Sequence, residues 1–269
     1  MQEVRNTRQG KQDAYDQRMP SSQLPPMDET LTTADLNEAT TRYDAAFRDV
    51  QGLIWLPWAG QHFPQRPPRR RLLVVGESHY VRPQTPEQLE TSRQQHLEAP
   101  QYTRNVVSEC LVNAAWPTKT LDRLPKLPFK TTEIDRPRLW ADTAFYNLVQ
   151  RPMHYNQEGQ PEGPSWDDFV AGWRVFADVV RVIQPSHCLF IGVEAANSFN
   201  HTMTSLALSF VNVAWTEQVG RTYARTAKLE IAGKTTELFF VQHLGKFFRG
   251  CHALCWEMEL SMRVMKASQ

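Results

Sequence analysis

A run of four consecutive apolar residues at positions 72–75 ends in Gly76 and is followed by polar residues at 77–80. Unbroken apolar runs of this length are typical of a parallel β-strand that is covered on both faces. In open α/β sheets, ligands bind beyond the carboxyl ends of such strands. The run therefore predicts that residues 77–80 face a cleft. The alternative is an ordinary strand-to-loop transition whose polar residues are solvated.

Three further segments complete the expected sheet. Residues 188–192 and 238–241 are short apolar runs, and the apolar residues at 145–149 fit either a second buried strand or the end of a helix. Apolar residues also recur at helical spacing over 169–183, after a capping serine, Ser165. A strand, a helix and a strand in this order form a right-handed parallel crossover. We therefore predict an α/β protein with a central, mostly parallel sheet of about four strands.

The remaining segments indicate one domain with two additions. Residues 1–32 are polar and poor in clustered apolar residues, which is typical of a disordered arm. Residues 33–50 have the spacing of an amphipathic helix, and a last helix is expected at about 252–264. We expect residues 33–269 to form a single domain with this N-terminal helical extension and an insertion at about 81–140.

The composition indicates the cellular compartment of the protein but does not identify a binding partner. The chain has 30 Lys and Arg residues against 29 Asp and Glu, so its formal net charge of +1 neither demands nor excludes a polyanion. The four cysteines contain no CxxC pair and are too few for a disulfide framework in 269 residues, so we expect a reducing cytoplasm. No run approaches the roughly 18 apolar residues of a membrane span, and no membrane contact is expected.

The polar residues at three strand ends occur in an order that resembles the uracil-DNA glycosylase superfamily. Gly76 and Tyr80 match the ends of the GQDPY motif of family 1 enzymes, and Gly76 with Glu77 matches the start of the family 4 motif GE[AG]PG. Asn147 follows the second predicted strand, as in the family. His243 follows the last strand, where the family carries a His-Pro-Ser motif. The resemblance implies a three-layer α/β/α sandwich.

By this resemblance the strand ends would form a pocket for a base flipped out of DNA. His243 would donate a hydrogen bond to O2 of the departing pyrimidine and stabilise its developing charge. Asn147 would read the edge of the base, since its amide both donates and accepts. Tyr80 would act as a steric gate at C5 of the base, and Gly76 would line the same pocket.

The water-activating position departs from the family 1 pattern. Ser78 stands where family 1 enzymes have an aspartate, and a serine has no useful base pKa. Ser78 is therefore expected only to border the base. Glu77 and His79 are the neighbouring replacements, either of which would orient water or face the sugar cation, and we rank Glu77 first.

Further candidates have weaker sequence support. Phe145 or Trp116 would supply an aromatic plane for the extruded base, although aromatic residues in such apolar contexts are more often core residues. Lys246 and Arg249, which follow the last strand, are candidate contacts to the DNA backbone. Arg151, which precedes a proline as in the family 4 pattern, is a third. The alternative for these cations is a solvated surface.

We expect neither a cofactor nor a metal. Family 4 enzymes hold an iron–sulfur cluster through four cysteines, whereas this chain lacks both the close cysteine pair and a cysteine near the first motif. A serine hydrolase that uses Ser78 is disfavoured because the sequence has no GxSxG elbow.

The departures at Ser78 and after His243, together with the insertion, indicate a substrate other than uracil. The specific hypothesis is a monomeric DNA glycosylase that removes a modified pyrimidine. Glucosylated hydroxymethylcytosine of phage DNA is one such base, and its removal would leave abasic sites as a defence against phage. Uracil excision in base-excision repair is the alternative within the family. A non-catalytic nucleic-acid-binding module of the same fold is the alternative from another class.

Overall fold

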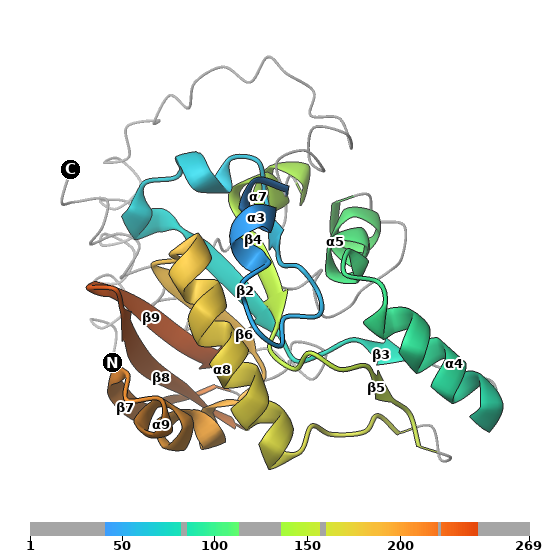
Figure 1. Ribbon diagram of the computed structural model, residues 1–269. Coiled ribbons are helices and arrows are strands. Elements are labelled where there is room, and N and C mark those ends of the chain that lie inside the picture. The colour runs from blue at the N-terminus through green and yellow to red at the C-terminus, as the bar shows by residue number, and fades with distance from the viewer. Residues whose placement is uncertain (1–40, 82–84, 113–135, 157–159, 220–221, 242–269) are drawn as a thin grey trace, which may run out of the picture. The chain divides into compact units, whose positions relative to one another are not determined.

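The computed structural model describes residues 41–81, 85–112, 136–156, 160–219 and 222–241 (Figure 1). The chain separates into two units, Met1–Leu31 and Thr32–Gln269, and every described residue belongs to the second. The predicted arm at 1–32 and the predicted last helix at 252–264 lie outside the described residues.

A seven-stranded sheet forms the centre of the second unit, in the order β1-β4-β2-β6-β9-β8-β7. Its four middle strands are parallel to one another: β4 (Ala144–Asn147), β2 (Leu72–Gly76), β6 (His187–Ile191) and β9 (Lys234–Val241). They contain the four predicted segments, and the ambiguous segment at 145–149 begins as a strand. The α/β class and the mostly parallel sheet are confirmed, whereas the predicted count of about four strands is too low.

Antiparallel strands extend this parallel core on both sides. β1 (Trp58–Ala59) pairs with β4, while β8 (Thr222–Ile231) pairs with β9 and with β7 (Ser209–Val219). A two-residue turn joins β8 to β9, with positive φ at both Ala232 (51°) and Gly233 (71°). Positive φ at both central residues is what a type I′ hairpin turn requires. The strand count was too low because β7 and β8 are only partly buried and contain many polar residues.

A second, two-stranded sheet continues directly from the carboxyl ends of β2 and β4. It pairs β3 (Tyr80–Val81) with β5 (Met153–His154) in parallel. Beyond β2 and β4, the Leu148 and Val149 N–H groups donate to the Gly76 and Glu77 carbonyls, at 3.0 and 2.9 Å. The two chain segments that leave the main sheet there are thus hydrogen-bonded to each other.

Helix α8 (Trp166–Ile183) has the predicted start and the predicted apolar face. The Ser165 hydroxyl accepts a hydrogen bond from the Asp168 N–H at 3.1 Å, and the Asp168 carboxylate accepts one from the Ser165 N–H at 2.7 Å. This reciprocal pair is a capping box, which satisfies donors left free in the first helical turn. Trp173 and Phe176 of α8 are fully buried against Phe190 of β6. Figure 1 shows α8 crossing the sheet, close to α9 (Ala196–Ser205).

Helices contact both faces of the sheet at β4. Neighbouring residues of a strand point to opposite faces. Tyr146 packs against Phe176 of α8, with ring centroids 6.2 Å apart, and Phe145 packs against Trp140 of α7 (Arg136–Asp142), at 6.0 Å. α8 and α7 therefore lie on opposite faces of this strand.

Short helices occupy the segments before β2 and within the predicted insertion. Before β2 lie η1 (Thr41–Tyr43), α3 (Asp44–Phe47), η2 (Phe63–Gln65) and η3 (Pro68–Arg70). The described part of the insertion contains α4 (Pro86–Leu97), α5 (Tyr102–Val106) and the π-helical η4 (Val107–Val112). None of the helices in the described segments has the length and apolar character that crossing a membrane requires.

Candidate functional site

The carboxyl ends of the four parallel strands meet at one edge of the sheet. Gly76 of β2 is in register with Asn147 of β4, and Ile191 of β6 is in register with Val241 of β9. The polar residues after β2 and β4 are therefore neighbours, as predicted for parallel strands. His243 comes two residues after β9 in the sequence. It lies outside the described residues, as do Trp116, Lys246 and Arg249.

Gly76 and Asn147 are packed so closely that any side chain at position 76 would displace the Asn147 amide. A Cβ atom built there would lie 2.2 Å from Asn147 Oδ1 and 3.1 Å from Phe145 Cζ. Asn147 is buried, with 3 % of its surface exposed. Phe145 is buried too, between Gly76 and the Trp140 ring, which is the surrounding of a core residue. We name Gly76, Glu77, Tyr80, Asn147 and Gly192 the carboxyl-edge site.

A narrow hollow, with room for about one water molecule, lies between the ends of β2 and β6. Its lining residues are Val75, Gly76, Glu77, Leu148, Phe169, Phe190, Ile191, Gly192 and Ala195. Among these nine described residues, only Glu77 is ionisable. Glu77 Oε2 lies 3.7 Å from the position that a Cβ of Gly192 would take. The site thus presents one carboxylate to an otherwise apolar hollow.

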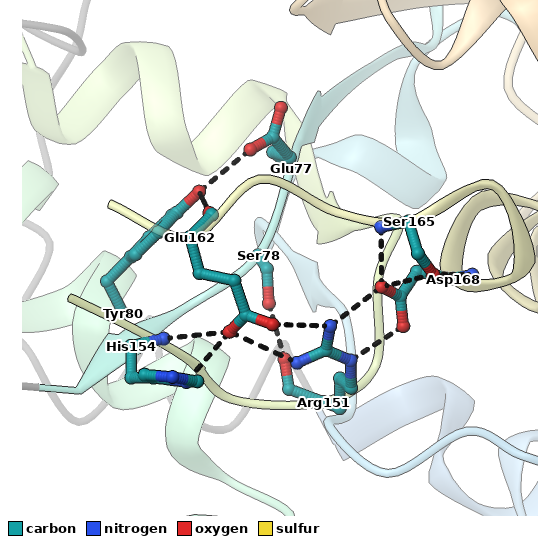
Figure 2. Close-up of polar contacts among 8 residues, drawn as sticks. All are labelled: Glu77, Ser78, Tyr80, Arg151, His154, Glu162, Ser165 and Asp168. Atoms are coloured by element: carbon teal, nitrogen blue, oxygen red, sulfur yellow. Dashed lines mark hydrogen bonds and ion pairs between the residues drawn. The ribbon is translucent and has the colours of Figure 1, made fainter. Parts of the chain in front are cut away.

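Tyr80 holds the Glu77 carboxylate in place (Figure 2). Its hydroxyl donates to Glu77 Oε1 at 2.8 Å and lies 3.1 Å from the Glu162 carbonyl oxygen. Burial raises the pKa of Tyr80 above its ordinary value, and the nearby Glu77 carboxylate raises it further. Tyr80 therefore remains a proton donor at neutral pH. The sequence suggested a steric gate at this position and gave no indication of the bond to Glu77.

Ser78 and His79 face other parts of the protein. Ser78 donates to the Arg151 carbonyl oxygen at 2.6 Å. His79 Nε2 lies 2.8 Å from Thr103 Oγ1, and the ring makes edge contacts with Trp55 and Tyr102. Burial, with a smaller effect of His96, lowers the pKa of His79 to about 3, so the imidazole is neutral at physiological pH. These contacts are those of a structural histidine, and a catalytic role for His79 stays a prediction.

Arg151, a predicted DNA contact, is paired with two carboxylates (Figure 2). Its Nε and Nη2 donate to the two oxygens of Asp168 at 2.6 and 2.7 Å, and Nη2 also lies 3.1 Å from Glu162 Oε1. The hydrogen bonds to Asp168 raise the pKa of Arg151, and Arg151 in turn lowers the pKa of Asp168 to about 2. A phosphate would have to compete with these partners. The pairing instead connects the segment after β4 to the first turn of α8.

Two neighbours of Arg151 complete this network. His154 Nδ1 lies 2.8 Å from Glu162 Oε2, within ion-pair distance but without hydrogen-bond geometry. The His154 N–H also donates to Glu162 Oε2 at 3.4 Å. Glu162 thereby connects β5 to Arg151, and its own carbonyl oxygen reaches Tyr80. No sequence motif pointed to Glu162, because its partners come from β3, from β5 and from the segment after β4.

Gln150 supports Asn147 and was also missed. Its Nε2 donates to the Asn147 carbonyl oxygen at 2.6 Å, and its Oε1 accepts from the N–H groups of Ile54 and Trp55 at 3.0 and 2.9 Å. Gln150 therefore ties the backbone of residues 54–55 to the turn that carries Asn147. The only sequence cue was the spacing of three residues between Asn147 and Gln150.

The described residues contain no group of three or more His, Cys, Asp or Glu side chains arranged to hold a metal ion. Comparison of the chain with protein-family models and with curated proteins found no match. In the part of the chain that the structure describes, the carboxyl-edge site brings the Asn147 amide and the Glu77 carboxylate close to an apolar hollow.

Proposed function

We propose that this chain is a DNA glycosylase that flips out a modified or non-standard pyrimidine and hydrolyses its N-glycosidic bond, leaving an abasic site. The observation that carries the proposal is the packing of Asn147 against Gly76 at adjacent carboxyl ends, with Glu77 beside them. The order of these residues along the chain resembles that of the uracil-DNA glycosylase superfamily. The proposal includes the three-layer α/β/α form of that fold.

The residues of the site suit the charges that such a reaction develops. Cleavage leaves positive charge on the sugar and negative charge on the departing base, so a catalyst must stabilise both. The Glu77 carboxylate, fixed by Tyr80, would face the sugar cation or orient the attacking water. The Asn147 amide would hydrogen-bond the edge of the base. His243, two residues beyond β9, would donate to the departing base.

The substrate class follows from what differs from the uracil enzymes. Ser78 replaces the aspartate of family 1, and its hydroxyl is already bonded to the Arg151 carbonyl oxygen. We therefore propose a modified cytosine, with glucosylated hydroxymethylcytosine of phage DNA as the specific candidate, and with uracil as the alternative. The proposed enzyme acts on DNA as a monomer in the cytoplasm, and its proposed role is defence against phage.

The test measures release of free base and alkali-sensitive strand breakage on DNA that contains glucosylated hydroxymethylcytosine, uracil or only normal bases. We expect release from the first substrate, and we expect Asn147→Ala and Glu77→Gln to lower the rate at least about 100-fold. Glu98→Gln, an exposed substitution outside the site, should leave the rate unchanged.

Three results would count against the proposal in different ways. Release from uracil DNA alone would select the repair enzyme. DNA binding without release from any substrate would select the non-catalytic module. Release that is unaffected by both Asn147→Ala and Glu77→Gln would show that the carboxyl-edge site is not where the reaction occurs.

A further inference from the structure

Strands β7 and β8 present exposed aromatic side chains beside an arginine. Trp215 is 63 % exposed and Tyr223 is 47 % exposed, and their rings lie 6.0 Å apart at nearly a right angle. Arg225 Cζ lies 4.1 Å from the centroid of the Trp215 ring, which is cation–π distance. We name Trp215, Tyr223 and Arg225 the aromatic patch. Large exposed aromatic residues in a cluster are typical of binding surfaces.

The strand register places the aromatic patch at the same edge of the sheet as the carboxyl-edge site. β7 and β9 are both antiparallel to β8, so β7 runs in the direction of the parallel core. Trp215 is paired with Arg225, and Arg225 is paired with Phe240, the residue before the carboxyl end of β9. Tyr223 is two residues further toward the start of β8. The hairpin formed by β7 and β8 therefore extends past the carboxyl ends of β6 and β9.

The aromatic patch is held in a fixed arrangement and contains one cation, Arg225. The Arg225 guanidinium donates to Asn197 Oδ1 of α9, and Asn197 Nδ2 donates to Glu194 Oε2 at 2.9 Å. Lys228, the other described basic residue of β8, is paired with Glu237 at 2.7 Å, so Arg225 is the cation that the described part of this strand brings to the patch. An arginine beside exposed aromatic rings combines the two features by which proteins hold single-stranded nucleic acid.

We propose that the aromatic patch is a stacking platform for an unpaired base of a DNA strand that crosses the carboxyl edge. Trp215 supplies the stacking surface, because 63 % of its surface is exposed although Arg225 lies over the ring. Arg225 attracts a phosphate of the same strand. This inference rests on the proposed function in one respect, which is that the bound strand belongs to the DNA substrate. It adds a contact about which the superfamily resemblance says nothing.

The test measures binding of a single-stranded oligonucleotide that carries 2-aminopurine, by fluorescence anisotropy and by quenching of the base on stacking. Trp215→Ala should weaken binding about tenfold and abolish the quenching, because each base stacked on an aromatic ring contributes that order of affinity. Trp215→Phe should restore most of both. Val211→Ala, at a residue of β7 that is 51 % exposed, is the matched control and should bind as the wild type.

The outcomes separate this inference from the proposed function. If no substrate releases a base but Trp215→Ala still loses oligonucleotide binding, the stacking platform stands and the glycosylase proposal falls. If bases are released and Trp215→Ala binds and quenches like the wild type, the glycosylase proposal stands and the stacking platform falls. If Trp215→Ala lowers the unfolding midpoint, Tyr223→Ala and Arg225→Lys are measured in its place. Both should also weaken oligonucleotide binding. Self-association that depends on Trp215, without DNA binding, would overturn the inference.

Discussion

Gly76 is the residue at which the carboxyl-edge site tolerates least change. In Gly76→Ala the new Cβ would lie 2.2 Å from Asn147 Oδ1, so the amide must move. We expect a loss of about 1–3 kcal/mol in the free energy of unfolding, as for other overpacked sites. Base release should fall much further than stability alone explains, because the displaced amide no longer meets the base. Denaturant unfolding and the base-release assay measure the two effects.

Gly163→Ala is the matched control for this substitution. A Cβ at position 163 has no atom within 4 Å among its neighbours, so neither stability nor activity should change by more than a few tenths of a kcal/mol. Equal behaviour of the two variants would contradict the close packing of Gly76 against Asn147.

At the scale of the element, the start of α8 joins the helix to the segment after β4. Asp168 accepts from the Ser165 N–H and from two Arg151 nitrogens. Asp168→Asn replaces these charge-assisted bonds with weaker ones, and we expect it to cost about 2 kcal/mol of unfolding free energy. Asp178→Asn changes an exposed pair with Arg181 on the same helix and should cost less than about 1 kcal/mol.

The pH dependence of unfolding gives an independent check on Asp168. Its pKa is lowered from 3.8 to about 2, chiefly by the hydrogen bonds from Arg151. A carboxylate with a depressed pKa in the folded state stabilises the protein above its unfolded pKa, and this contribution is lost as the pH falls through the folded pKa. The wild type should therefore lose stability between about pH 4 and about pH 2 more steeply than Asp168→Asn. Parallel curves would contradict the pairing.

Helices and strands with a clear pattern of apolar residues could be predicted from the sequence, and those without such a pattern could not. α8 combines a capping serine with apolar residues at helical spacing, and both were recognised. α4 has no apolar stripe, although its start at Thr85 carries a capping box with Gln88 that the sequence already displayed. The described side chains of β7 are half-buried or exposed, and β8 mixes buried with exposed residues, so neither strand has the continuous apolar run that predicts a buried strand.

At the scale of the whole molecule, topology explains why part of the site was predictable. Parallel strands bring their carboxyl ends together, so the sequence order of strand ends was enough to place Gly76 next to Asn147. Side-chain direction after a strand depends on tertiary contacts. His79 therefore turns to Thr103 and Tyr80 turns back to Glu77, which no local pattern indicated. The partners of Arg151 likewise come from a later loop and from α8.

The same topology leads to a prediction about His243. β9 ends beside β6 at the carboxyl edge, and His243 follows that end by two residues. If His243 donates to the departing base, its bond strengthens only as charge develops in the transition state. His243→Ala should then lower kcat about 100- to 1,000-fold, as removal of an oxyanion donor does, with little change in KM or in the unfolding midpoint. His62→Ala, at a residue before η2 whose side chain is 46 % exposed, should leave all three unchanged. A rise in KM with kcat unchanged would instead place His243 among the groups that only bind DNA.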